Sequence, residues 1–291
     1  MENERHFYHL SSDGMSSEIL FKTPEEFIAG MNRIALCILG TAIVLFAFCL
    51  MDNHFHLVVY GTYEECKDFI KRYRRRTGQW LVYHGLNGRL LEYPEVDIKC
   101  IPDEEYLKNA IVYDIMNPPK AFMPYLPQGY RWSSASLYFN DLSSVINQYK
   151  RVDSLKQAEI HRLLDTKASV PPHWLVSSDG LIWPGCYTDY KYVEKLFRTP
   201  LVMIERMNRP VENQINKDMC FDRLSIPDME LLEKTKAIAR SMFGTGSISD
   251  LDARQRVELA KRVHSQTKVS FKQIAKAVHL KYESLGILTK G

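Results

Sequence analysis

The sequence predicts an α+β protein with an antiparallel sheet in its first half and an all-α region at its C-terminal end. Up to about residue 121, short apolar runs alternate with amphipathic helical patterns. From about residue 225 the pattern is helical throughout. This order of elements is typical of an α+β domain followed by a helical one, and 291 residues are enough for about two domains.

The elements of the first half follow from local signals. Thr23-Pro24 resembles an N-cap followed by proline at the first helical position, and acidic residues follow Pro102 where another helix should begin. Strands are expected at 6–10, 18–22, 42–50, 54–60 and 96–101, and helices at 24–37, 63–83 and 103–116.

Residues 34–51 are uncharged and almost long enough to cross a membrane. Gly40-Thr41 interrupts the stretch and no basic flank follows it, so we expect a helix end, a turn and a buried strand instead. The first ten residues are polar, unlike a signal peptide, and the six cysteines are scattered without a CxxC pair. We therefore expect a cytoplasmic protein without a membrane segment or a disulfide framework.

The second half predicts three further features. Residues 142–224 are expected to form a helical connector between a domain at 1–141 and another at 225–291, with Pro171-Pro172 as a linker. Helices are expected at 226–243, 250–265, 270–278 and 281–289, and the third begins with a capping box from Ser270 to Gln273. The short third helix, a turn at His279-Leu280 and the last helix have the form of a helix-turn-helix. A small helical bundle without a role in DNA binding is the alternative.

Two histidines occupy an otherwise apolar strand in the segment MDNHFHLVVY, residues 51–60. Side chains alternate along a strand, so His54 and His56 share one face. A metal ion is the simplest common partner for two neighbouring imidazoles, because neutral imidazole is a common ligand. A half-exposed polar strand face explains the pair about equally well.

Tyr113 and Asn117 are four residues apart in the helix that ends before Pro118. They should therefore project from the same side of that helix, about one turn from each other. A core tyrosine with a satisfied hydroxyl would be the ordinary explanation for Tyr113 alone. The histidine pair makes a shared site the more specific hypothesis.

Together these motifs resemble the single-tyrosine transposases of the His-hydrophobic-His (HUH) type, and most of all the REP-associated tyrosine transposases. The matching segments, in order over about 140 residues, are ILFKTPEEF (19–27), FCLMDNHFHLVV (48–59), PDEEYLKNAIVYDIMNPPKA (102–121) and YRWSSASLYF (130–139). The sequence departs from the family at Asp52, where proline is usual, and at 119–122, where Val-Lys/Arg-Ala-Gly is usual. Neither departure removes a catalytic group.

The resemblance implies a ferredoxin-like catalytic domain and a chemical mechanism. His54, His56 and the side-chain oxygen of Asn117 would bind Mg²⁺ or Mn²⁺, and Tyr113 would attack a scissile DNA phosphate. The products would be a 5′-phosphotyrosine link and a free 3′-hydroxyl, and the stored bond would allow rejoining without ATP. A non-catalytic DNA-binding regulator with the same fold is the alternative, and so is a relaxase or replication initiator of the same chemical class.

The expected partner is single-stranded or hairpin DNA at the nucleoid. The net charge is only +3, so affinity for DNA must come from local patches. One such patch is the run 71–76, with Tyr73 interleaved among the cations, and an ordinary solvated helix face is the alternative for it. The C-terminal helices resemble those of replication-initiator and Trp-repressor-like domains. The candidate DNA contacts are Lys71, Arg72, Arg74, Arg75, Arg76, Lys120, Lys272, Gln273, Lys281, Tyr282 and Ser284. The sequence is compatible with a homodimer, with Tyr113 acting in its own subunit or in the partner.

Overall fold

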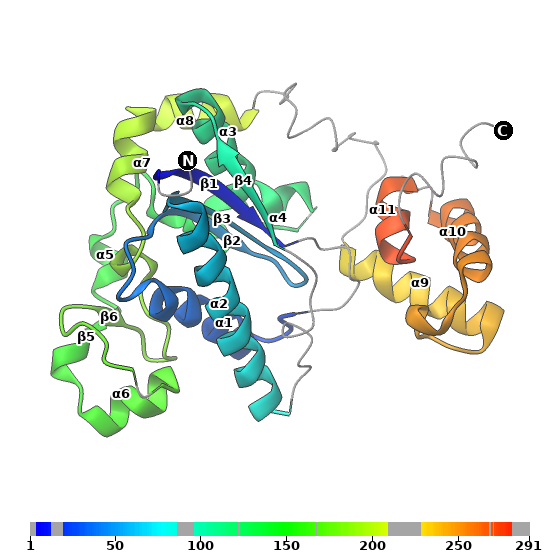
Figure 1. Ribbon diagram of the computed structural model, residues 1–291, viewed down its shortest axis with the longest axis horizontal. Helices are drawn as coiled ribbons and strands as arrows, with labels where there is room; N and C mark the ends of the chain where they lie inside the picture. The colour runs from blue at the N-terminus through cyan, green and yellow to red at the C-terminus, as the bar shows by residue number, and fades with distance from the viewer. Residues whose placement is uncertain are drawn as a thin grey trace. The chain divides into compact units, whose positions relative to one another are not determined.

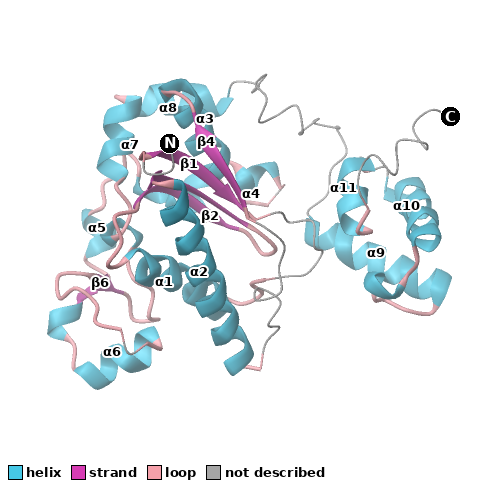
Figure 2. Cartoon of the chain, viewed as in Figure 1, coloured by secondary structure: helices cyan, strands magenta, loops and turns pink. Residues whose placement is uncertain are grey.

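The computed structural model describes residues 4–12, 20–85, 96–121, 123–166, 168–208, 228–267, 269 and 271–280. Its contacts divide the chain into two compact units. The first comprises 1–13, 19–117 and 125–209, and the second comprises 14–18, 118–124 and 210–291. The structure is mixed α+β, as the sequence predicts (Figure 2).

The first unit is built on a four-stranded antiparallel sheet whose strand order is β2-β3-β1-β4 (Figure 1). The strands are β1 (His6–Ser11), β2 (Val44–Leu50), β3 (Phe55–Gly61) and β4 (Asp97–Ile101). Helix α1 (Pro24–Ile38) joins β1 to β2, and α2 (Tyr63–Tyr83) joins β3 to β4. All of these elements were expected from the sequence, with bounds that differ by at most two residues.

One predicted strand, 18–22, is wrong in its described part. Residues 18 and 19 lie outside the described residues, and residues 20–22 form no strand. The backbone N–H groups of Leu20 and Phe21 donate to the carbonyl oxygen of Asp52, at 2.6 and 2.9 Å. This apolar run is a buried connection against the turn that precedes β3, and its backbone donors are satisfied there and not by a sheet neighbour.

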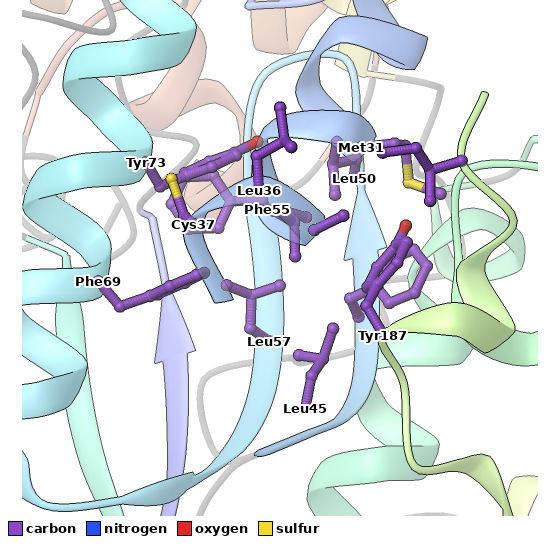
Figure 3. Close-up of a cluster of buried hydrophobic side chains, with 14 of the residues drawn as sticks. Met31, Leu36, Cys37, Leu45, Leu50, Phe55, Leu57, Phe69, Tyr73 and Tyr187 are labelled. Carbon is purple, nitrogen blue, oxygen red and sulfur yellow. The ribbon is translucent and has the colours of Figure 1, made fainter. Parts of the chain in front are cut away.

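The two faces of the sheet are covered by different helices. Leu10, Leu57 and Val59 point to the face that packs against α1 and α2, and Figure 3 shows part of this apolar core. Gly30 lets α1 pack closely against the ring of Phe21, because a Cβ atom at this position would lie 2.8 Å from that ring. Val58 points to the opposite face, which packs against α3 (Glu104–Ile115).

Local signals set the ends of the helices on both faces. The side chain of Thr23 accepts a hydrogen bond from the Glu26 N–H, and Thr62 and Glu65 form a capping box at the start of α2. The Asp103 carboxylate caps α3 at 2.7 Å from the N atom of Tyr106. These caps satisfy N–H groups that have no partner within the helix, so the helices begin at these residues.

The uncharged stretch at 34–51 divides as expected. Helix α1 ends at Ile38, Gly40 turns the chain with a φ of 73°, and β2 begins at Val44. Within the part of the chain that the structure describes, every helix is too short or too polar to span a bilayer. Five cysteines fall within the described residues, and all of them are free thiols.

Helix α3 packs against α8 (Pro200–Asn208), while α7 (Tyr190–Phe197) packs against α8 and β2, and all three helices share one hydrophobic cluster. Arg206 on α8 donates to Asn109 at 2.8 Å and pairs with Glu105 at 2.6 Å. The Arg206 side chain is only 13% exposed, so this attachment is partly shielded from water. The helix that carries Tyr113 is thus attached to both the sheet and α8.

The outer edge of β2 is covered by the segment YRWSSASLYF, residues 130–139. The Leu50 N–H donates to the carbonyl of Trp132 at 2.9 Å, and the Tyr130 hydroxyl donates to the carbonyl of Leu50 at 2.8 Å. The Trp132 ring stacks on Phe27, with centroids 4.9 Å apart. Covering a sheet edge in this way satisfies its exposed backbone groups and blocks unwanted strand pairing.

The remaining elements of the first unit are short. They are α4 (Asn117–Lys120), η2 (Pro127–Gly129), η3 (Ser134–Leu137), α5 (Ser143–Ile146), β5 (Lys150–Arg151), η4 (Val152–Ser154), α6 (Gln157–Leu164), β6 (Leu175–Val176) and η5 (Pro184–Cys186). Strands β5 and β6 form a separate antiparallel ribbon. Residues 125–209 belong to the same compact unit as the sheet, although α4 continues into the second unit at Pro118.

The second unit contains α9 (Asp228–Phe243), η6 (Ile248–Asp250), α10 (Ala253–Thr267) and α11 (Phe271–Ala277) around its own apolar cluster. The expected turn after α11 is present, because His279 has a φ of 56°. Arg256 fixes this turn by donating to the carbonyls of Leu251, Ser249 and His279. Ser270 and the predicted last helix, 281–289, lie outside the described residues.

Candidate active site

The two motif histidines lie side by side at the start of β3. The ring centroids of His54 and His56 are 4.9 Å apart and nearly perpendicular. His56 is buried and His54 half-buried. Nδ1 of His54 lies 2.6 Å from Oδ1 of Asn53, which favours the tautomer with the proton on Nδ1 and the lone pair on Nε2. The neighbouring imidazoles expected from the sequence are therefore present.

A third histidine, His9, reaches the same place from β1. In the antiparallel pairing of β1 with β3, His9 is opposite Val58 and Ser11 is opposite His56. His9 and His56 are thus diagonal neighbours on one face of the sheet. Their rings are parallel, with an interplanar angle of 2° and centroids 5.5 Å apart.

Helix α3 brings Tyr113 against this histidine cluster. The Tyr113 ring centroid lies 5.2 Å from that of His56 and 5.8 Å from that of His9, edge-on to both at 84°. Tyr113 is half-buried, whereas both of these histidines are buried. The phenol and the imidazoles thus lie in one place, as the sequence hypothesis requires.

Asp114, the next residue of α3, adds a carboxylate to the cluster. Its side chain is completely buried, and Oδ1 lies 2.8 Å from Nε2 of His9. One ligand atom each from His9, His56 and Asp114 lies within 4.8 Å of the others, so this buried group could hold a metal ion. Two imidazoles and one carboxylate are a donor set suited to a divalent ion.

Asn117 lies two residues past the C-terminal end of the same helix and is the first residue of α4. Its Nδ2 donates to the carbonyls of Tyr113, at 3.0 Å, and Asp114, at 3.3 Å. These bonds satisfy carbonyls of the last turn, which have no partner within the helix. Asn117 therefore has a capping role, and its role as a metal ligand stays a prediction.

The cations of α2 lie on the other side of the sheet. The α2 side chains Phe69, Ile70 and Tyr73 pack into the cluster of Leu10 and Leu57, whereas the histidines share a face with Val58. The DNA-contact hypothesis for Lys71, Arg72, Arg74, Arg75 and Arg76 stays a prediction. The cations and the histidines are on opposite faces of the sheet, so one DNA strand would have to pass around the sheet to reach both.

Three of these cations line an open groove of about 560 Å³ between α2 and the turn before β2. The groove residues are Gly40, Thr41, Ala42, Glu65, Asp68, Lys71, Arg72 and Arg75. Phosphate groups would find cations along this groove, with acidic residues at the N-terminal end of α2.

The structure corrects one detail of the α2 hypothesis. Tyr73 was expected to be interleaved with the cations on the nucleic-acid-binding surface, but it is completely buried. Its ring contacts Phe55 edge-on, with centroids 5.2 Å apart, and stacks on Phe69. Burial raises the pKa of Tyr73 well above its usual range. An i, i+4 spacing from Phe69 places it in the core, so it is not available to stack on bases.

The other candidate DNA contacts stay predictions. Lys120 ends α4 and is half-buried. In the second unit, Gln273 lies half-buried on α11, and Lys272 belongs to the same helix, but its side chain is outside the described residues. Lys281, Tyr282 and Ser284 lie outside the described residues altogether.

Sequence reasoning missed His9 and Asp114. A lone histidine in a short strand gives no sign of its partners, since the pairing of β1 with β3 joins residues far apart in the chain. Asp114 carried a weak signal, because it is the only charged residue in the otherwise apolar run AIVYDIM, at 110–116. A carboxylate within such a buried run needs a partner, and here that partner is His9.

Comparisons with protein-family models, with curated proteins and with solved structures found no match to this chain. The resemblance to single-tyrosine transposases therefore rests on the sequence motifs alone.

Proposed function

We propose that the chain is a metal-dependent single-strand DNA endonuclease and strand transferase that acts on hairpin-forming repeats through a phosphotyrosine intermediate on Tyr113. One observation supports this more than any other. The Tyr113 ring lies 5.2 Å from His56, which is itself next to His54. The residues that the motif requires to act together are therefore neighbours in space.

The surroundings of Tyr113 suit a nucleophile that must be held in position. Its helix is capped at the N-terminal end by Asp103 and attached to α8 through Arg206. His9 and His56 contact its ring from the sheet side. Holding a reacting group in one geometry lowers the entropic part of the barrier, so a rigid tyrosine favours attack on a bound phosphate.

In the proposed reaction the Tyr113 hydroxyl oxygen attacks the phosphorus and loses its proton to solvent. The bond from phosphorus to the 3′-oxygen of the leaving strand breaks, and that oxygen is protonated to a 3′-hydroxyl. A phosphodiester to tyrosine replaces the phosphodiester to the strand. Attack by the 3′-hydroxyl of an acceptor strand reverses these changes and releases the tyrosine.

The chain's donor set fits a divalent ion, because His56 has an imidazole neighbour on each side and the carboxylate of Asp114 lies beside His9. Mg²⁺ or Mn²⁺, when bound, would polarise the scissile phosphate and offset the charge that develops on it. The motif predicts His54, His56 and Asn117 as the ligands, and the buried group of His9, His56 and Asp114 is a rival ligand set.

Other parts of the structure support the same proposal. The element order β1-α1-β2-β3-α2-β4 and the strand order β2-β3-β1-β4 are compatible with the ferredoxin-like arrangement that the motif implies. The cationic groove on α2 offers a surface for a phosphate backbone. Helix α11 and the turn at His279 are compatible with the first helix and the turn of a helix-turn-helix that binds DNA.

The test uses labelled hairpin oligonucleotides and Mn²⁺ with the full chain. We expect a covalent protein–DNA adduct that survives denaturation, and we expect Tyr113→Phe to abolish it while hairpin binding stays within about twofold. Tyr125→Phe is the matched control, because this tyrosine is exposed, its ring packs on that of Tyr130, and its loss should leave the adduct unchanged.

The alternative is a DNA-binding regulator without catalytic activity. Hairpin binding without an adduct, unaffected by metal and by Tyr113→Phe, would support that alternative. Failure of the folded chain to form an adduct with a broad range of hairpins would rule out the proposed function.

A further inference from the structure

We propose that the ion at this site is a first-row transition metal bound by His9, His56 and Asp114, so that two of its three protein ligands lie outside the His-hydrophobic-His motif. The role of this ion in DNA cleavage rests on the proposed function, but metal binding itself does not. The two are measured separately below.

The three side chains come from three elements that the fold brings together. His9 is on β1, His56 is on the adjacent strand β3, and Asp114 is on the helix that covers this face of the sheet. Their ligand atoms lie within 4.8 Å of one another. Ligands about 2.0–2.2 Å from an ion lie roughly 3–3.5 Å apart, so the group would close on a metal through side-chain rotations that turn the two stacked imidazoles out of parallel.

Burial and charge favour an ion at this point. His9, His56 and Asp114 are 7%, 6% and 0% exposed. A carboxylate removed from water is unfavourable unless a positive group or strong hydrogen bonds compensate for it. Without metal, the 2.8 Å hydrogen bond to His9 compensates for the burial of the Asp114 carboxylate. A divalent ion would replace this hydrogen bond with two ligand bonds.

The donor set also indicates which ions are preferred. Imidazole suits Zn²⁺, Cu²⁺, Fe²⁺ and Ni²⁺, whereas Mg²⁺, Ca²⁺ and Mn²⁺ prefer oxygen ligands and Mg²⁺ loses its water reluctantly. Two imidazoles and one buried carboxylate should therefore bind Zn²⁺ most tightly, Mn²⁺ less tightly and Mg²⁺ poorly.

This ligand set differs from the motif's set in two residues. Asn117 directs its Nδ2 to the carbonyls of α3, and His54 is less buried than His9. The set of His9, His56 and Asp114 has His9 and Asp114 in place of His54 and Asn117. Each set can therefore be tested by variants that leave the other set unchanged.

The experiment is calorimetric titration of the metal-free full chain with MnCl₂, ZnCl₂ and MgCl₂. We expect His9→Asn and Asp114→Asn each to weaken Mn²⁺ binding at least tenfold. Losing a residue that only supports a metal ligand already weakens binding by about tenfold or more, and losing a ligand should cost no less. The matched variants His54→Asn and Asn117→Ala should bind Mn²⁺ within about threefold of the unmodified chain. His161→Asn, on exposed α6, controls for histidine loss elsewhere.

A second measurement uses the unmodified chain, because substitutions of buried residues can unfold it. In the chain labelled with ¹⁵N-histidine, Zn²⁺ should move the NMR chemical shifts of the ring nitrogens of His9 and His56 to metal-bound values. It should not do so for His54. Failure of Mn²⁺ and Zn²⁺ to bind, or loss of binding in His54→Asn with His9→Asn unaffected, would overturn the inference. Adduct formation under the same conditions reports on the proposed function independently.

Discussion

The two faces of the sheet use the same strands for different purposes. Leu57 and His56 are adjacent in β3, and Leu10 and His9 are adjacent in β1. Leu57 and Leu10 pack into the apolar core under α1 and α2, whereas His56 and His9 meet Tyr113 and Asp114 under α3. Alternation along a strand thus separates residues that stabilise the fold from residues available for chemistry.

The separation extends to the helices. Helix α2 contributes Phe69, Ile70 and Tyr73 to the core and presents its cations to solvent. Helix α3 contributes apolar residues to its own cluster but directs Tyr113 and Asp114 to the histidines. The apolar face should therefore respond to substitution mainly in stability, and the α3 face mainly in ligand binding and activity.

The largest expected effect tests this contrast in adjacent residues of β3. Leu57→Ala should lower the free energy of unfolding by about 2–5 kcal/mol, because it leaves a cavity in a packed core. His56→Gln should lower it by about 1 kcal/mol, a typical value for a single substitution, and should abolish metal binding and adduct formation. Urea denaturation measures both. A loss of stability in His56→Gln equal to that in Leu57→Ala would mean that His56 is mainly a core residue.

An intermediate effect concerns the cations of α2. Replacing Lys71, Arg72 and Arg75 with alanine should weaken binding of single-stranded DNA and reduce the slope of log affinity against log salt by about 2, because each phosphate contact contributes about 0.7. Stability should change little, since these side chains line an open groove. The control replaces Lys156, Arg162 and Lys195, which are exposed on other elements.

Salt-dependent binding by fluorescence anisotropy measures this slope. Equal losses in the two triple variants would mean that α2 contributes only general positive charge. An unchanged slope in the α2 variant would remove these cations from the DNA-binding surface.

The smallest expected effect concerns the attachment of α6 to α2. Trp80 and His84 on α2 hydrogen-bond the Asp165 carboxylate, at 2.5 and 3.0 Å. Partial burial acts to raise the pKa of Asp165, but these hydrogen bonds outweigh it and the net shift is downward. The bonds therefore contribute stability above the usual aspartate pKa of 3.8, and this contribution is lost as the pH falls through the lower pKa of the folded state.

Asp165→Asn removes this contribution and keeps a residue that tolerates the left-handed conformation at this position, where φ is 46°. We expect the variant to have a melting temperature slightly below that of the unmodified chain at pH 7, and we expect this difference to shrink as the pH falls below 3.8. The effect is small because the carboxylate is half exposed. A difference that does not shrink as the pH falls below 3.8 would mean that the carboxylate charge is not its source.

The sequence alone determined the strands of the four-stranded sheet, the helices α1, α2 and α3, and the faces on which the motif side chains lie. Thr23, Thr62 and Asp103 cap their helices from within a few residues, and period-two alternation put His54 and His56 on one side of a strand. The four-residue spacing placed Tyr113 and Asn117 near each other. These are local properties, so a reading of neighbouring residues predicted them.

Only the tertiary structure decided what surrounds those side chains. His9 and Asp114 are 105 positions apart, and they meet because β1 pairs with β3 in one register and α3 packs over that face. The tertiary structure likewise put Tyr73 in the core and the cations of α2 on the opposite side of the sheet from the histidines. The physical reason is that register and helix packing depend on contacts distributed over the whole core, which no local pattern encodes.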